Sequence, residues 1–147
     1  MSPTPSRPAP VSSTALDLLA LARRGLAQAA LPRPHHERYA AAHLAALRAA
    51  AAVLAVRARP DDAGRHRVRS VWALLPKVAP ELTEWAAFFA SNARKRAAAE
   101  AGLTRAVTTR EADDLVRDVE TFLGLVENVL GLPHQPPLPS HHVYWAS

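Results

Sequence analysis

Apolar residues recur every three or four positions along most of the chain, which is the spacing that gathers side chains on one face of an α-helix. No stretch of four or more residues alternates between β-branched and polar side chains, as a half-buried strand would. Short connections separate the periodic stretches, and no internal repeat is present. The pattern therefore predicts an all-α fold, a four- to five-helix up-and-down bundle.

The first two predicted helices lie on either side of a proline-containing turn. The first runs from about Thr14, as its N-cap, to about Leu31, where prolines end it. Its apolar stripe consists of Leu16, Leu19, Leu26 and Ala30. The second runs from His35 or His36 to about Ala58. Its apolar side consists of Tyr39, Ala40, His43, Leu47, Ala50 and Leu54.

Three further helices are predicted in the second half of the chain. A short helix ends before Pro76 and carries Val68, Val71, Trp72 and Leu75. A fourth helix runs from Pro80 to near Gly102. Its inward face consists of Leu82, Trp85, Phe88, Phe89 and Asn92. A fifth opens with a capping box of Thr108 and Glu111 and ends at Gly131. On this fifth helix we expect the following polar residues to face water: Asp113, Asp114, Arg117, Asp118 and Glu120.

The pattern places one helical domain at residues 13–131. Residues 1–12 are rich in Pro and Ser, and we expect a flexible tail without the apolar core of an export signal. Residues 132–147 are rich in Pro and His and are expected to form an irregular tail. The lack of cysteine excludes a disulfide framework and a cysteine nucleophile, and it favours a cytoplasmic location. The longest charge-free stretch near the middle ends at Arg57, so we expect no membrane span.

The net charge of +5 is distributed unevenly along the chain. Residues 1–110 carry a net charge of +10, and residues 111–147 carry −5. A positive surface attracts nucleic acid through its phosphates, but an acidic segment can neutralise that surface by packing beside it or by docking onto a second copy. Charge alone therefore leaves RNA contact and self-association open.

One pair of residues has the chemistry for RNA cleavage without a metal. Four residues separate Arg38 from His43; a neutral imidazole can take the proton of a 2′-hydroxyl, and a guanidinium can hold the charge that develops on the phosphorane. In one regular helix the two side chains lie roughly 140° apart, so they converge only across a dimer interface or at an irregular first turn. The alternative is that His43 is a core histidine and Arg38 a solvated first-turn residue.

Two basic clusters are candidates for phosphate contact. They consist of Arg65, Arg67 and Arg69 in a loop and of Arg94, Lys95 and Arg96 near the end of the fourth predicted helix. The alternative for both clusters is simple solvation, and cations near a helix C-terminus also complement the helix dipole. The histidines of the C-terminal tail, His134, His141 and His142, make a poor metal site because a proline-rich segment fixes few ligands. We therefore expect no metal, and no phosphate-binding or hydrolase motif points to a cofactor.

Three stretches resemble a known family: RYAAAHLAALRAAAAVLAVRARP, SVWALLPKVAPELTEWAAFFASNARKRAAAEAGL and TREADDLVRDVETFLGLVENVLG. They are similar to an actinobacterial branch of the HEPN superfamily, named for the nucleotide-binding domains of higher eukaryotes and prokaryotes, over roughly residues 14–131. The resemblance implies a helical bundle and frequent homodimerisation. It also implies a link to RNA, because many relatives are metal-independent endoribonucleases, whereas others are inactive partners or nucleotide-binding accessories.

Active relatives carry an Arg and, a few residues later, a His on a helix late in the bundle. Here Arg38 and His43 have such a spacing on an early helix, and no His follows Arg94 or Arg96 within reach. The sequence therefore predicts a homodimeric HEPN-like protein with an RNA-related role, either RNA binding or cleavage by Arg38 and His43. The alternative is a non-catalytic dimeric adaptor for a protein partner, such as one encoded nearby.

Overall fold

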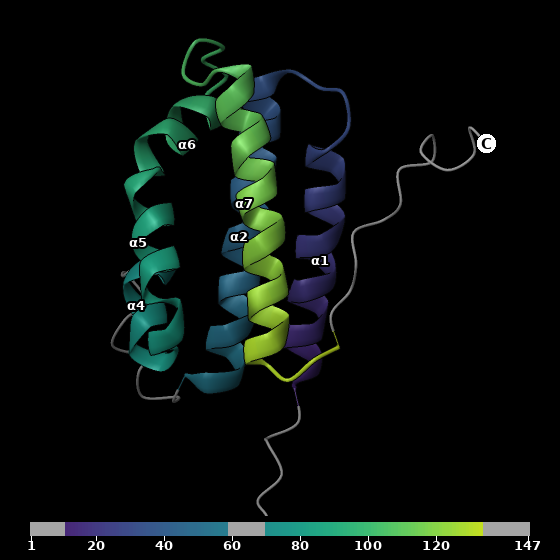
Figure 1. Cartoon of the computed structure of the whole chain (residues 1–147), viewed down its shortest axis with the longest axis vertical. Coiled ribbons are helices and arrows are strands. Elements are labelled where there is room, and N and C mark those ends of the chain that lie inside the picture. Colours follow the sequence, from purple (N-terminus) through teal and green to yellow (C-terminus); the bar gives the residue numbers. More distant parts are fainter. Residues whose placement is uncertain (1–10, 59–69, 134–147) are drawn as a thin grey trace, which may run out of the picture.

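A computed structural model of the chain describes residues 11–58 and 70–133. This described part contains six α-helices, one 3-10 turn and no strand, which confirms the all-α prediction. The elements are α1 (Ser13–Ala29), α2 (His35–Arg57), α4 (Val71–Val78), η1 (Pro80–Leu82), α5 (Thr83–Ser91), α6 (Ala93–Glu100) and α7 (Thr109–Val129). Figure 1 shows α1, α2 and α7 side by side, with α4, α5 and α6 forming a second column beside them.

The ends of the helices are fixed by local side-chain and glycine chemistry. The hydroxyl of Ser12, rather than the predicted Thr14, caps α1 by accepting a hydrogen bond from the Ala15 amide at 3.2 Å. The predicted capping box at the start of α7 is present. Gly102 and Gly131 have φ values of 83° and 70°, a left-handed conformation that glycine adopts at little cost after a helix. The structure confirms the predicted bounds of the second and fifth helices, α2 and α7, to within a few residues.

The predicted helix from Pro80 to Gly102 is instead three short elements. After the 3-10 turn η1, α5 ends at Ser91, and Asn92 separates it from α6. The Ser91 hydroxyl donates to the Phe88 carbonyl at 2.7 Å, so two successive polar side chains lie where the helix is interrupted. The prediction of one long helix was wrong, because the good helix formers on both sides hide this local break in the sequence. Asn92, which we predicted on the inward face, is half-buried.

Pro76 does not end the short helix that carries Trp72. It lies inside α4, which continues to Val78 and closes with the Ala79 amide donating to the Leu75 carbonyl at 2.8 Å. The predicted end, before Pro76, is thus three residues too early. Val68, which we had expected on this helix, lies outside the described residues.

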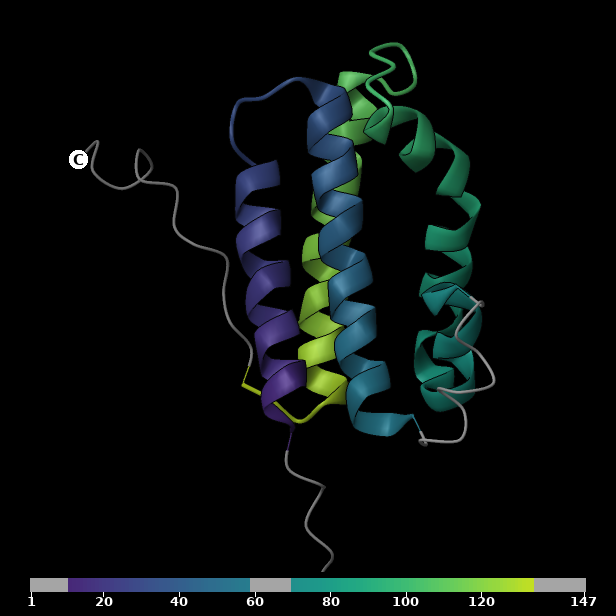
Figure 2. The ribbon, with the colours of Figure 1, turned by 180° about the vertical axis from the view of Figure 1, so that it is seen from behind.

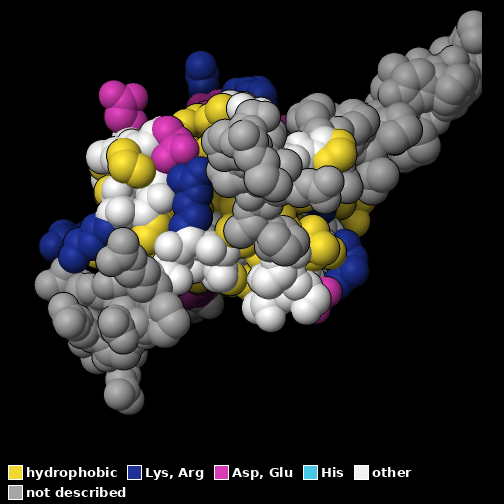
Figure 3. Space-filling view, turned by 90° about the horizontal axis from the view of Figure 1, so that it is seen from below, with side chains coloured by type: hydrophobic (Ala, Val, Ile, Leu, Met, Phe, Trp, Pro, Cys, Tyr) yellow, Lys and Arg dark blue, Asp and Glu magenta, His cyan; other side chains and the backbone are white. Residues whose placement is uncertain are grey.

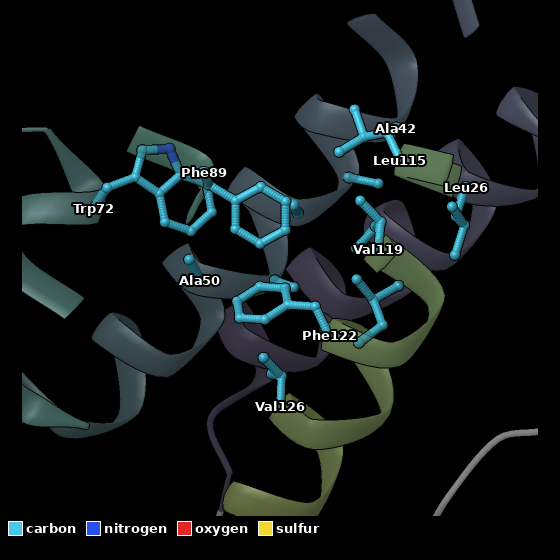
Figure 4. Packing of buried hydrophobic residues seen from close by; sticks show 14 of the residues in the cluster. Leu26, Ala42, Ala50, Trp72, Phe89, Leu115, Val119, Phe122 and Val126 are labelled. Atoms are coloured by element: carbon cyan, nitrogen blue, oxygen red, sulfur yellow. The ribbon is translucent and has the colours of Figure 1, made fainter. Parts of the chain in front are cut away.

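Aromatic rings fill the core between the two columns of helices (Figure 4). Phe89 and Phe122 are fully buried with their ring centroids 5.0 Å apart. Trp72 stacks on Phe89 at 4.7 Å. Two residues predicted to lie inward are exposed instead, since Leu16 is 47% and Phe88 36% accessible. The core therefore joins α4, α5 and α7 against the central helix α2.

Helix α2 lies at the centre of the fold and contacts α1, α4, α6 and α7. Between Arg38 and Arg57 its only charged side chain is Arg48, and by length and mean hydropathy, 1.6, it could cross a membrane. One charge interrupts the apolar run without making the helix polar, and the expectation of no membrane span stays a prediction. Because α2 packs against several helices, its surface is apolar on more than one side. Half of its most apolar 18-residue stretch is buried in the bundle.

Arg57 closes the end of the bundle where α1 begins and α7 ends. Its guanidinium donates to the Val78 carbonyl at 3.1 Å and to the Val129 carbonyl at 3.3 Å, and it pairs with Glu81 at 3.2 Å. These contacts tie the C-terminal end of α2 to both columns. Figure 3 views this end and shows charged and hydrophobic side chains interspersed among the residues that the structure describes.

Candidate functional site

His43 lies inside the core rather than on an accessible surface. It is 1% exposed, and its ring meets Trp72 and Phe89 edge-on at centroid distances of 5.9 and 5.6 Å. Its Nε2 lies 3.3 Å from the Phe89 carbonyl oxygen. Because a carbonyl oxygen only accepts hydrogen bonds, Nε2 carries the hydrogen and donates it. The side chain thus ties α2 to α5 from within the bundle.

The protonation of His43 follows from this environment. Burial lowers the pKa of His43 below its usual value, and the hydrogen bond to the Phe89 carbonyl offsets the decrease only in part. With the hydrogen on Nε2, the unprotonated Nδ1 is buried and has no hydrogen-bond partner in the described part of the chain. The imidazole is therefore neutral near pH 7, but neither of its nitrogens faces solvent.

Arg38 connects three helices and is not the solvated residue that we had weighed as the alternative to a catalytic role. Its Nε donates to the Ala29 carbonyl at the end of α1 at 2.9 Å, and Nη1 pairs with Asp113 of α7 at 2.6 Å. The side chain is 14% exposed. Asp113, which we predicted to face water, is 48% exposed and also accepts this ion pair. Arg38 thus fixes the start of α2 against α1 and α7.

The structure does not bring Arg38 and His43 together at one surface. His43 points between α4 and α5, whereas Arg38 is held by the end of α1 and by α7. A general base must come within hydrogen-bond reach, about 2.6–3.2 Å, of the proton that it removes. In this fold His43 is only 1% exposed, so a ribose hydroxyl cannot come within this distance of its ring nitrogens.

The second basic cluster is largely neutralised by the protein itself. Lys95 pairs with Glu111 of α7, and Arg96 pairs with Glu100 one turn along α6 at 2.9 Å. Arg94 is exposed and has no ion pair among the described residues. The other predicted cluster, Arg65, Arg67 and Arg69, lies outside the residues that the structure describes. Of the described candidates for phosphate contact, Arg94 alone retains an uncompensated charge.

Two shallow hollows on the surface involve residues that the sequence analysis had not selected. One, of about 300 Å³, lies between α5 and α7 and is lined by Glu84, Trp85, Phe88 and Asp118. The other, of about 390 Å³, lies between the start of α2 and the end of α6 and is lined by Arg33, His36, Glu37, Ala40, Ala99, Glu100 and Gly102. The sequence analysis had assigned Trp85 and Phe88 of the first hollow to the inward face of their helix.

No group of three or more His, Asp or Glu side chains is placed to hold a metal ion within residues 11–58 and 70–133. The histidines of the tail that we considered as ligands, His134, His141 and His142, lie outside these ranges.

A sequence model of the SAV_6107-like HEPN family matches residues 29–127, which is more than half of the chain. No curated protein and no solved structure matches the chain significantly. The matched segment begins at the last residue of α1 and ends within α7, so it contains Arg38, His43 and both hollows.

Proposed function

The chain belongs to the SAV_6107-like HEPN family, and from this premise we propose that it acts as a non-catalytic, self-associating module that binds a partner through its surface. One observation carries the proposal: the histidine with the spacing of an active site is 1% exposed and hydrogen-bonded inside the core. The guanidinium of Arg38, the other member of the predicted pair, donates hydrogen bonds to the Ala29 carbonyl and to the Asp113 carboxylate. Both residues support the bundle, and neither is free to act on a phosphodiester.

The outer face of α2 is the surface that we propose for self-association. Figure 2 shows α2 at the front of the bundle, with no described helix over it. Leu44 is 39% exposed at the centre of this face. The α2 face, as we call it, consists of Ala40, Leu44, Leu47, Ala51 and Ala55, which lie within about 80° of one another around the helix. An uncharged stripe of this kind favours contact with another apolar surface.

A second copy of the chain fits the α2 face better than a charged partner does. Three of its five residues are alanines, so two helices can approach closely across a two-fold axis. The neighbouring cation, Arg48, lies against α1, where its Nη1 is 4.0 Å from the position that a Cβ on Gly25 would occupy. The stripe is therefore left without a charge that would have to be desolvated on association.

Leu44→Glu is expected to convert a homodimer into a monomer. It places a carboxylate from each copy in an apolar interface, which should raise the dimer dissociation constant roughly 100-fold. Light scattering at tens of micromolar protein should give twice the chain mass of 15.8 kDa for the wild type and the single-chain mass for the variant. Leu16→Glu on α1, an exposed leucine outside the α2 face, should remain dimeric. A wild-type mass near 15.8 kDa would contradict self-association.

RNA binding without cleavage is the second function that we propose. It rests on three arginines at the α6–α7 end, by which we mean α6, the start of α7 and the segment between them; these arginines have no ion pair in the described residues. These are Arg94, Arg105 and Arg110, all exposed. Arg94 and Arg110 each neighbour in sequence a member of the Lys95–Glu111 ion pair, which joins the starts of α6 and α7. Arginines held near one end of a rigid bundle are suited to contact phosphates without reading base sequence.

Arg94→Glu together with Arg110→Glu should weaken binding to single-stranded RNA equally for all base sequences and should reduce its salt dependence. A matched control reverses two exposed cations elsewhere, Arg24 on α1 and Lys77 on α4, to Glu, and it should change affinity much less. Fluorescence anisotropy at two salt concentrations measures both effects. Equal affinity of both variants, or no binding by the wild type at micromolar protein, would rule out an RNA surface at the α6–α7 end.

A further inference from the structure

The hollow between α5 and α7, which we call the α5–α7 groove, joins aromatic rings to free carboxylates. Glu84, Trp85 and Phe88 come from α5, and Asp118 comes from α7. Its volume of about 300 Å³ is at the lower end of ordinary ligand sites, and the groove is open to solvent. A groove of this size accepts a single side chain of a partner more readily than a large cofactor.

The rings of the groove are held rigidly by the core beneath them. Trp85 stacks on Phe89 at a centroid distance of 6.0 Å and an interplanar angle of 28°, and it lies 5.6 Å from Phe122. Phe88 meets Trp85 edge-on at 6.0 Å and is 36% exposed. The exposed aromatic surface is thus already ordered before binding, so a ligand would bind without the entropy cost of ordering these rings.

The carboxylates of the groove lack partners that their neighbours have. Neither Glu84 nor Asp118 forms a hydrogen bond or an ion pair with the described residues, and Asp118 is half-buried. Arg117, the cation that acts on Asp118, is already paired with Asp114.

The electrostatics of Asp118 follow from this lack of partners. Burial raises the pKa of Asp118, Asp114 raises it further, and Arg117 offsets these effects only in part. With two carboxylates and no cation in its lining, the groove is a local negative site on a chain whose net charge is positive.

We propose that the α5–α7 groove binds an arginine side chain of a protein partner, packed against Trp85 and Phe88 and paired with Glu84 and Asp118. A guanidinium is planar, stacks on aromatic faces and forks onto carboxylates, and it is more weakly hydrated than an ammonium group. The two carboxylates would thereby gain the cation that the fold does not supply. This inference rests on the proposed binding role and names the site and the chemistry of the partner.

A capped tripeptide, acetyl-Ala-Arg-Ala-amide, tests the groove directly in an NMR titration of the full chain. We expect saturable shifts of the Trp85 indole N–H with a dissociation constant of about millimolar, because one stacked and paired cation contributes only modestly. Glu84→Gln with Asp118→Asn should raise that constant at least tenfold without disturbing the rings. Asp17→Asn with Glu37→Gln removes the same net charge from exposed positions elsewhere and should leave it unchanged.

Two related peptides define what the groove recognises. The citrulline peptide, which keeps the shape of arginine without its charge, should not bind, and the lysine peptide should bind several-fold more weakly. Equal binding by the lysine peptide, no saturable shift at Trp85, or equal affinity of the groove variant and its control would each overturn the proposal. Leu44→Glu, made monomeric, should still bind the arginine peptide, so failure of self-association is distinguishable from failure of the groove.

Discussion

His43→Ala is expected to lower the melting temperature by about 5–15 °C, because it opens a cavity in the aromatic core and removes a hydrogen bond between α2 and α5. The imidazole of His43 contacts Trp72 and Phe89 and donates to the Phe89 carbonyl at 3.3 Å, so truncation leaves that oxygen without its side-chain donor. Thermal unfolding followed by circular dichroism measures the change. A decrease of less than about 2 °C would show that the core does not depend on this ring.

The pH dependence of stability provides a second readout at His43. The folded state holds the pKa of His43 below its ordinary value, so at mildly acidic pH the unfolded chain binds the proton more readily than the folded one does. The contribution of His43 is therefore fully present above about pH 7.5 and decreases as pH falls through about 6.5, the unfolded value. His43→Gln retains an N–H donor and cannot titrate, so its loss of stability between about pH 7 and pH 5 should be smaller than that of the wild type. Parallel curves would contradict this account.

The second large effect is expected for Arg23→Leu, which removes the ion pair that Arg23 forms with a buried carboxylate. Arg23 of α1 donates to both carboxylate oxygens of Glu127 on α7, at 2.5 and 3.1 Å, and to Glu120 at 2.8 Å. Burial alone would lower the pKa of Arg23, but the hydrogen bonds to Glu127 and Glu120 raise it overall. Glu127 is buried, so loss of this fork should cost about 3 kcal/mol of unfolding free energy.

The double variant Arg23→Leu with Glu127→Leu separates the cost of removing one member of the pair from the net contribution of the pair to stability. Replacing both members of a buried pair by apolar residues is often close to neutral, so the double variant should recover most of the stability that the single one loses. Urea unfolding of the wild type and both variants gives the three free energies. A double variant that is no more stable than Arg23→Leu would indicate that the packing of Arg23, rather than the charge of Glu127, dominates.

Local chemistry made much of the helical fold predictable. The capping box at Thr108 and the glycines Gly102 and Gly131 act within a few residues, so the bounds of α7 could be read from the chain. The apolar repeat likewise identified Leu19 and Leu26 of α1 as buried. The break at Asn92 escaped prediction because it depends on a few polar groups within a segment of strong helix formers.

The contacts that decide the roles of Arg38 and His43 lie between residues distant in sequence. Arg38 pairs with Asp113 across 75 positions, and His43 reaches Phe89 across 46. Helical periodicity shows which side of its own helix a residue occupies, but not which charged group faces it from another helix. For this reason His43 stayed ambiguous between a core and a catalytic residue, and Arg38 was never expected to bridge helices.

The α5–α7 groove was missed for a related reason. Trp85, Phe88 and Phe89 are adjacent on α5, and periodicity alone assigned all three to the core. The structure buries Phe89 and leaves Phe88 exposed beside Asp118, because α7 covers only part of this helix. Such a hollow becomes visible only when two helices are placed relative to each other.

The most direct test of the central claim, that His43 supports the bundle and does not cleave RNA, is a cleavage assay in EDTA with wild type and His43→Gln side by side. The account predicts no cleavage of a mixed-sequence single-stranded RNA above the protein-free rate by either protein, although both are folded. Metal-independent cleavage by the wild type that falls roughly 100-fold or more in His43→Gln would contradict it, because that loss is the signature of a general base.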